Sequence, residues 1–211
     1  MFDKSKETEI ALDTHKAPAD IHDRIALRLV KAMRVFADAF FAKRYGHRAV
    51  VLETVAAVPG MVGGLLQHLS AIRHIRDDEG WIRELLDEAE NERMHLMTFI
   101  KIAQPSALER AVILVGQALF FNAYFFLYLF APRTAHRVVG YLEEEAVISY
   151  TQYLAQVDKG LAENVPAPEL AIDYWGLPAD ARLREVIVAV RADEAGHRDK
   201  NHGFADALAG R

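Results

Sequence analysis

The feature that most constrains this fold is a short pattern that the sequence carries twice: an isolated glutamate, followed in the next predicted helix by Glu-x-x-His. Glu92 and His95 form the first of these words, and Glu194 and His197 form the second. Residues three apart on a helix lie on the same face, so each word directs one carboxylate and one imidazole toward a single point. One such word alone is weak, because an exposed polar face explains it equally well.

The two isolated glutamates precede these words. Glu53 interrupts an apolar run over residues 49–58, where a buried carboxylate is costly unless something compensates its charge. Glu143 begins the triple Glu143-Glu144-Glu145, and periodicity does not decide which of the three faces inward. A single Glu from each of two helices, with Glu-x-x-His from each of two others, is the ligand set of a di-iron carboxylate bundle.

Two iron ions suit these donors. Four carboxylates neutralise two ferrous ions, hard oxygen ligands suit ferric iron, and imidazole suits both oxidation states. Six carboxylate-rich ligands exceed the tetrahedral site that zinc prefers, whereas manganese could use the same donors. The alternative is that four solvated glutamates and two incidental histidines share no site. The order of the six residues along four predicted helices argues against that alternative.

Composition excludes several classes of protein. The chain has 211 residues, 52% of them hydrophobic, which suits one domain with a sizeable core. It has no cysteine, so disulfides, zinc–thiolate sites, iron–sulfur clusters and cysteine nucleophiles are excluded. A net charge of -5 argues against nucleic acid as a partner. We predict a polar tail over residues 1–20, without a targeting signal, and a single di-iron helical-bundle domain over residues 21–211.

Hydrophobic periodicity predicts helices over most of the chain and no strand of useful length, so the expected fold class is all-α. The predicted helices are residues 21–45, 48–76, 81–103, 111–131, 134–159 and 180–208. Residues 164–178 contain three prolines and are predicted to form a loop.

Two of these helices raise the question of a membrane. Residues 111–131 contain no charged side chain and are long enough to span a bilayer, yet a buried central helix gives the same pattern. The first helix places Arg24, Arg28, Lys31 and Arg34 on one stripe opposite apolar residues. That stripe fits either a membrane surface or a solvated basic face. Hydropathy leaves these alternatives open.

Four stretches of sequence are together highly specific. They are residues 44–48 running into 52–61, then 91–96, 142–146 and 191–199. On these motifs, nearly all of residues 34–204 resembles the alternative oxidase family, the cyanide-insensitive quinol oxidases of mitochondria and some bacteria. One departure is visible: the last motif of the family usually has two adjacent histidines, and Gly196 replaces the first of them.

The resemblance implies a non-haem di-iron centre with an oxo or hydroxo bridge. Its ligands would be Glu53, Glu92, His95, Glu143, Glu194 and His197. Tyr150, two helical turns after Glu143, would lie near the metals and supply a proton or an electron. Asn91 and Asp193 match partners that hold ligand imidazoles in one orientation. The residues that match the quinol pocket are Arg34, Asp38, Arg48, Leu52, Glu145 and Ala146.

The same resemblance implies a ferritin-like four-helix bundle, made of the second, third, fifth and sixth predicted helices with the others outside it. The protein would be monotopic, attached to one membrane leaflet as a homodimer. Because the polar N-terminal residues carry no targeting signal, we expect a bacterial member on the cytoplasmic face of a bacterial inner membrane. It would oxidise ubiquinol or a related quinol and reduce O2 to water by four electrons, without pumping protons. The alternatives are another di-iron oxygenase or hydroxylase, a ferroxidase or iron-storage assembly, and a transmembrane structural protein.

Overall fold

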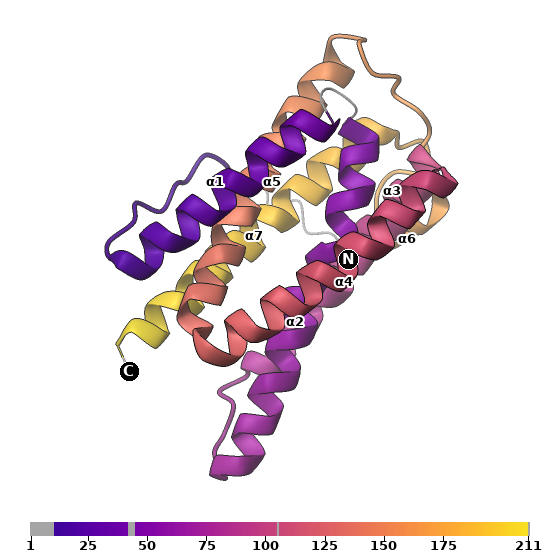
Figure 1. Cartoon of the computed structure of the whole chain (residues 1–211). Helices are drawn as coiled ribbons and strands as arrows, with labels where there is room; N and C mark the ends of the chain where they lie inside the picture. The colour runs from indigo at the N-terminus through magenta and orange to yellow at the C-terminus, as the bar shows by residue number, and fades with distance from the viewer. Residues whose placement is uncertain (1–10, 42–44, 105, 211) are drawn as a thin grey trace.

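The computed structural model describes residues 11–41, 45–104 and 106–210; the first ten residues of the predicted tail and Arg44 of the first motif lie outside the described residues. Within these ranges the chain forms seven α-helices and no strand, so the all-α prediction is confirmed. The helices are α1 (Ile21–Phe41), α2 (Tyr45–His74), α3 (Trp81–Ala103), α4 (Ala107–Phe130), α5 (Pro132–Asp158), α6 (Glu169–Trp175) and α7 (Leu183–Ala209) (Figure 1).

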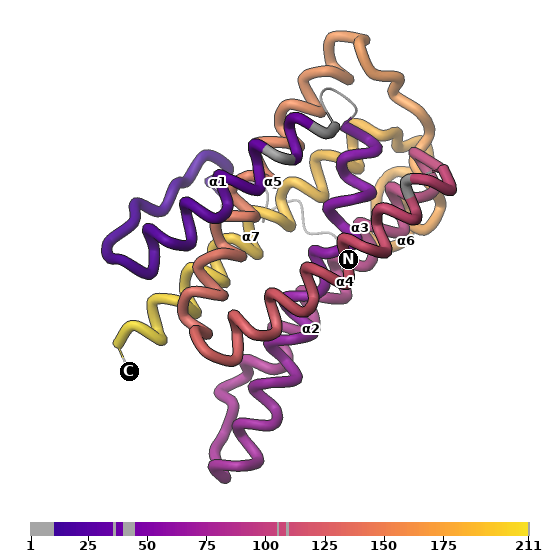
Figure 2. Tube along the Cα trace, in the orientation of Figure 1, coloured from indigo at the N-terminus to yellow at the C-terminus, as the bar shows by residue number. Residues whose placement is uncertain are grey.

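Four helices form the core of the bundle, as predicted. α2 packs along α3, and α5 packs along α7. α1 lies on α5, and α4 contacts both α2 and α5, so the two additional long helices lie outside the core (Figure 2). This arrangement places one Glu or one Glu-x-x-His word on each core helix.

The predicted loop over residues 164–178 contains a short helix, so that prediction is wrong in part. α6 begins after Pro168 and ends at Gly176, whose φ of 60° suits glycine. Ala171 and Trp175 are buried by this helix against the bundle. The flanking prolines dominated the prediction, whereas burial of these two side chains stabilises a helix of two turns.

A close approach between α2 and α3 depends on Gly60. Pro59 lies inside α2 without ending it. A Cβ atom added to Gly60 would overlap the carbonyl oxygen of Leu85 and lie 3.0 Å from the Cβ of Ala89. The absence of a side chain therefore lets the two backbones meet.

We expect Gly60→Ala to lower the free energy of unfolding by about 1–3 kcal/mol, because the backbone of α3 must move away. Urea unfolding followed by circular dichroism measures this loss. Gly116→Ala on α4 is the matched control, since a Cβ atom added there would meet nothing within 4 Å and alanine is the better helix former. Equal stability of Gly60→Ala and wild type would mean that the helices do not need this contact.

Helix α4, which carries no charged side chain from residue 111 onward, has one inward and one outward face. Gln117 Nε2 donates a hydrogen bond to the carbonyl oxygen of Thr54 at 3.0 Å, and Tyr124 and Tyr128 are buried. The exposed large apolar side chains are Leu108, Val112, Leu114, Val115, Leu119, Phe121, Phe126, Leu129 and Phe130. Among the described residues, α2 and α4 are long and apolar enough to cross a membrane by length and composition, but in their most apolar windows 44% of α2 and 11% of α4 are buried.

The segment before α1 packs across α5 and α7. The buried guanidinium of Arg198 donates to the carbonyl oxygens of Ala11 and Leu12, and the amide of Lys16 donates to the Glu144 carboxylate at 2.8 Å. Side chains of this segment also take part, because Nδ1 of His15 lies 2.5 Å from Oε2 of Glu144 and Nζ of Lys16 lies 2.5 Å from Oδ2 of Asp206. The described part of the predicted tail thus satisfies buried polar groups next to the core.

Candidate metal centre

Six side chains from the four core helices converge in the interior. α2 supplies Glu53, α3 supplies Glu92 and His95, α5 supplies Glu143, and α7 supplies Glu194 and His197. All six are buried, with at most 7% of any residue exposed. The predicted set of potential ligands is therefore brought together in space.

The donor atoms form two overlapping groups, and in each group they lie within 4.8 Å of one another. The His95 group is Glu53, Glu92, His95 and Glu194, and the His197 group is Glu92, Glu143, Glu194 and His197. Glu92 and Glu194 belong to both groups. The arrangement thus offers two neighbouring cation positions, each with one histidine and one glutamate of its own and two shared carboxylates.

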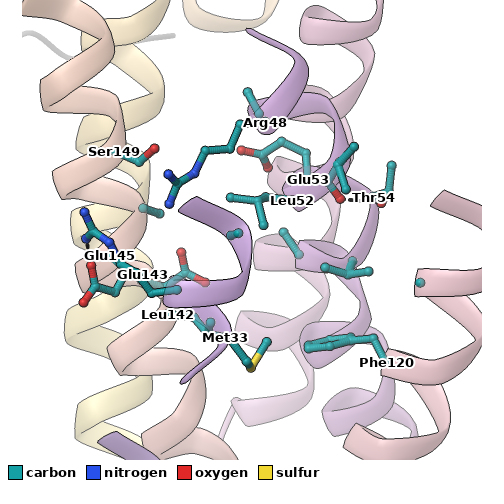
Figure 3. Close-up of a pocket in the computed structure, with 18 of the residues that line it drawn as sticks. Met33, Arg48, Leu52, Glu53, Thr54, Phe120, Leu142, Glu143, Glu145 and Ser149 are labelled. Carbon is teal, nitrogen blue, oxygen red and sulfur yellow. Dashed lines mark hydrogen bonds and ion pairs between the residues drawn. The ribbon is translucent and has the colours of Figure 1, made fainter. Parts of the chain in front are cut away.

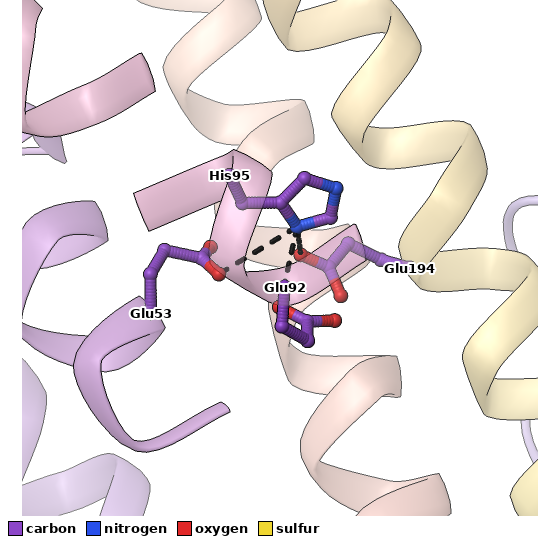
Figure 4. Close-up of side chains that lie close together, drawn as sticks. All are labelled: Glu53, Glu92, His95 and Glu194. Atoms are coloured by element: carbon purple, nitrogen blue, oxygen red, sulfur yellow. Dashed lines mark hydrogen bonds and ion pairs between the residues drawn. The ribbon is translucent and has the colours of Figure 1, made fainter. Parts of the chain in front are cut away.

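His95 is surrounded by three carboxylates (Figure 4). Its Nδ1 atom lies 3.2 Å from Oε2 of Glu92, 3.3 Å from Oε1 of Glu194 and 3.6 Å from Oε2 of Glu53. In the other group, Nδ1 of His197 lies 2.6 Å from Oε1 of Glu92. Each imidazole therefore directs the same ring nitrogen into the cluster.

The electrostatics of the cluster call for positive charge. Burial, followed by repulsion from Glu92 and Glu194, raises the pKa of Glu53 well above its usual value. Burial and then Glu194 do the same to the pKa of Glu143. Burial opposes protonation of His95, but the carboxylates, Glu92 first, raise its pKa well above the usual value. The buried carboxylates and imidazoles thus form a site that favours bound positive charge.

Several buried atoms at the centre have no hydrogen-bond partner among the described residues. They include Oε2 of Glu53 and Oε2 of Glu194. Such atoms are rare in folded proteins because each loses its hydration without compensation. They belong to residues of the two donor groups, so the residues fit a pair of metal ions.

The other ring nitrogen of His95 faces Asp193. Oδ2 of Asp193 lies 3.3 Å from Nε2 of His95, and it accepts hydrogen bonds from Asn91 at 3.0 Å and from Trp175 Nε1 at 2.8 Å. Asn91 and Asp193 therefore meet at one imidazole. The sequence analysis missed Trp175, which lies on α6; the only signal was a tryptophan within the predicted proline-rich loop.

Tyr150 is buried beside the His95 group. Its hydroxyl donates a hydrogen bond to Oε1 of Glu53, and its ring stacks on Phe99 with centroids 5.5 Å apart. Burial, followed by the charge of Glu53, raises the pKa of Tyr150 well above its usual value. The hydroxyl therefore keeps its proton in this position.

The three consecutive glutamates of α5 point to three different environments. Glu143 belongs to the His197 group. Glu144 lies 2.9 Å from Nε2 of His202, whereas Glu145 pairs with Arg34 on α1. Of the three, the geometry brings only Glu143 into the cluster.

A cavity of about 590 Å³ adjoins the cluster and is lined mainly by apolar side chains of α1, α2, α4 and α5 (Figure 3). Glu53, Glu143, Glu194 and Tyr150 line it, so the cavity reaches both donor groups. Five of the six predicted quinol-pocket residues also line it: Arg34, Arg48, Leu52, Glu145 and Ala146. The sixth, Asp38, pairs with Arg34 and Arg48.

The family was decided by comparison with known proteins. The sequence model described as "Alternative oxidase" matches residues 3–206. The chain belongs to the alternative oxidase family.

Relatives of known name agree with this assignment. The chain is 58% identical over 203 residues to the mitochondrial ubiquinol oxidase of Batrachochytrium dendrobatidis, and the matched region covers 96% of this chain and 64% of the relative. It is 59% identical over 197 residues to mitochondrial ubiquinol oxidase 1a of Arabidopsis thaliana, covering 93% and 56%. It is 54% identical over 204 residues to mitochondrial alternative oxidase 3 of Glycine max, covering 96% and 63%. The chain thus spans less than two thirds of the length of these relatives.

These names correct one expectation from the sequence. A bacterial member on the cytoplasmic face of a bacterial inner membrane was expected, but the similar alternative oxidases are named as mitochondrial proteins of a fungus and of plants. The expected location is therefore wrong. The polar N-terminal residues, on which it rested, carry no information about the compartment of a chain that covers only part of its relatives.

Gly196, where this chain departs from the usual motif of alternative oxidases, lies inside α7 with nothing within 4 Å of a Cβ built on it. We expect Gly196→Ala to raise the free energy of unfolding by about 1 kcal/mol, the difference between the two residues in a helix. Gly140→Ala provides the contrast, because its Cβ would overlap the His202 ring. Thermal unfolding of both variants tests this, and destabilisation by Gly196→Ala would show that the turn has no room.

Proposed function

We propose that this member of the alternative oxidase family oxidises ubiquinol or a related quinol and reduces O2 to water without pumping protons. The observation that carries the proposal is the shared wall between the cavity and the metal-binding residues. Glu53, Glu143 and Glu194 line the cavity and belong to the two donor groups. A molecule bound in the cavity would lie directly beside both metal positions.

The proposed cofactor is a pair of iron ions. The proposed ligands are Glu53, Glu92, His95, Glu143, Glu194 and His197. Iron, when bound, would supply electron transfer from the quinol and reaction with O2. The support is the donor set, in which carboxylate and imidazole suit both ferrous and ferric iron, together with the buried carboxylate oxygens of Glu53 and Glu194 that have no hydrogen bond.

The polar side chains at one wall of the cavity form the proposed quinol head-group site. Glu145 pairs with Arg34, Arg34 pairs with Asp38, and Asp38 pairs with Arg48. This series of ion pairs offers both hydrogen-bond donors and acceptors to the two hydroxyl groups of a quinol. The proposed site residues are Arg34, Asp38, Arg48, Leu52, Glu145 and Ala146.

Tyr150 is the proposed catalytic residue between the cavity and the His95 group. It lines the cavity and donates its hydroxyl hydrogen to Glu53. Burial raises its pKa, so the hydroxyl stays protonated and can orient the Glu53 carboxylate. It is proposed to supply a proton or an electron to the centre during turnover. Asn91 and Asp193 are proposed to orient the imidazole of His95.

We also propose attachment to one leaflet of a membrane, as a single domain over residues 21–211 and as a homodimer. α4 exposes a row of leucine, valine and phenylalanine side chains, and α1 exposes Ile21, Ile25, Leu29 and Val35. Side chains of α1 and α4, including Met33 and Phe120, also line the cavity, so an isoprenoid tail could leave it between these helices. The names of the relatives make a mitochondrial membrane the proposed location.

Quinol-driven oxygen uptake by the purified, iron-loaded protein in the presence of cyanide tests this function. We expect uptake, with quinone and water formed in the ratio that four-electron reduction of O2 requires. A hydroxylated product would favour another di-iron oxygenase on the same bundle. No uptake by protein shown to contain iron would overturn the proposal.

A further inference from the structure

The two donor groups contain the same residue types but have different surroundings. Asp193 lies against the imidazole of His95 and is itself held by Asn91 and Trp175. Within the part of the chain that the structure describes, His197 forms ion pairs only with Glu92 and Glu194, which are proposed ligands. The two proposed metal sites therefore differ in the residues that contact their ligands.

A second link between α3 and α7 lies on the side of His197. Glu88 is one helical turn before Glu92, and Asn201 is one turn after His197. Nδ2 of Asn201 lies 2.9 Å from each carboxylate oxygen of Glu88 and 3.1 Å from the carbonyl oxygen of His197. Glu88 and Asn201 are 3% and 1% exposed, so water does not compete for these bonds.

The link continues as a chain of buried hydrogen bonds. Oδ1 of Asn201 lies 3.0 Å from Nδ1 of His136, and Nε2 of His136 lies 3.0 Å from the hydroxyl of Tyr128. Gln67 Nε2 donates to that hydroxyl at 3.2 Å. Burial lowers the pKa of His136 to about 4, so the ring is neutral and has one donor and one acceptor nitrogen.

The donor and acceptor chemistry of these side chains gives the series of hydrogen bonds one direction. The amide oxygen of Asn201 can only accept, so Nδ1 of His136 carries the hydrogen and Nε2 accepts from Tyr128. Each donor along the chain consequently points toward the Glu88 carboxylate. Burial raises the pKa of Glu88 to about 7, and both of its carboxyl oxygens face the amide of Asn201 as acceptors.

Two amide–carboxylate links thus join α3 to α7 across the proposed centre. In one, Asn91 of α3 donates to Asp193 of α7; in the other, Asn201 of α7 donates to Glu88 of α3. The first link touches the imidazole of His95, whereas the second touches the backbone of His197. The pairing is symmetric in residue type and asymmetric in its contact with the ligands.

We propose that Glu88 and Asn201 are positioning residues for the His197 group, oriented by His136 and Tyr128, and that they make the two metal sites inequivalent. This inference rests on the proposed function, because it requires both sites to bind iron. A carboxylate bonded to a ligand imidazole strengthens metal binding by about 10–100-fold. The His95 group, which has that carboxylate, is therefore the tighter site.

Mössbauer spectra of protein loaded anaerobically with ferrous ⁵⁷Fe test the inference without using activity. We expect two quadrupole doublets in the wild type, and at limiting iron the doublet of the His95 group fills first. Asn201→Leu and Glu88→Gln should each alter the parameters of the late-filling doublet or abolish its intensity. Asp193→Asn should change the early-filling one. Glu90→Gln, which removes an exposed acid of α3 paired with Arg93, is the control and should leave both unchanged.

The outcomes separate this inference from the proposed function. A wild type without a second iron contradicts the di-iron proposal itself. Two wild-type doublets that Glu88→Gln and Asn201→Leu leave unaltered, or that respond alike to these changes and to Asp193→Asn, overturn the inference while the di-iron proposal stands. If Asn201→Leu does not fold, Glu88→Gln decides alone, because it preserves side-chain size.

Discussion

Glu92→Ala should remove both metal ions together and abolish quinol oxidation, while the helical content stays close to that of the wild type. Glu92 belongs to both donor groups, so its loss takes one carboxylate from each metal position. The bundle should remain folded because removal of a carboxylate relieves the repulsion that raises the pKa of Glu53. Iron analysis, circular dichroism and oxygen uptake on the same sample measure these effects.

Two comparisons make the Glu92 result specific. Glu53→Ala, which changes the His95 group alone, should leave iron at the other position. Glu90→Ala changes an exposed glutamate of the same helix, paired with Arg93, and should retain both ions and activity. Retention of two ions and of wild-type turnover in Glu92→Ala is the result that would remove this residue from the ligand set.

Arg48→Ala should raise the KM for quinol by about 10-fold or more with little change in iron content. Truncation of one partner of a buried ion pair costs about 2–5 kcal/mol, and the solvent exposure of Asp38 places this case near the lower limit. Arg48 is buried at the cavity and pairs with Asp38, and it is not among the metal-binding residues. Steady-state kinetics with a short-chain quinol measures the change.

The matched control for Arg48 is Arg93→Ala, which removes an exposed, paired arginine that does not line the cavity. Its KM should equal that of the wild type. Arg48→Lys keeps the charge but not the planar guanidinium, so an intermediate KM is expected. Unchanged quinol kinetics in Arg48→Ala would exclude Arg48 from the head-group site.

The sequence predicted best those parts of the site that depend on the geometry of a single helix. Glu92 with His95, and Glu194 with His197, had to share a face once their segments were helical, and the structure brings both pairs into one cluster. The inward residue of the glutamate triple was different: periodicity left it open, and only the family resemblance favoured Glu143. Its position depends on how α5 packs against α7, which a single helix does not encode.

Hydropathy could not decide the place of α4. An average over the window combines the buried side, with Gln117 and Tyr124, and the exposed side, with Leu119 and Phe130. Of the polar side chains that interrupt the charge-free run, Gln117, Tyr124 and Tyr128 face the bundle, whereas Asn122 is exposed. Polarity alone therefore does not separate the two faces.

Contacts made across the bundle were missed. Trp175 reaches Asp193 from a helix that proline-rich flanks concealed. Glu88 and Asn201 looked like ordinary polar residues, yet each lies four residues from a predicted ligand and therefore on its face of the helix. That spacing was an available signal, but only the packing of α3 on α7 shows that the two residues meet.

The central claim is that six side chains from four helices hold two iron ions beside the cavity. Anomalous diffraction at the iron absorption edge, from crystals of the iron-loaded protein, tests it most directly. The account predicts two peaks, both bonded by Glu92 and Glu194, one of them also by Glu53 and His95 and the other by Glu143 and His197. A single peak, or iron bound away from these side chains, would contradict it.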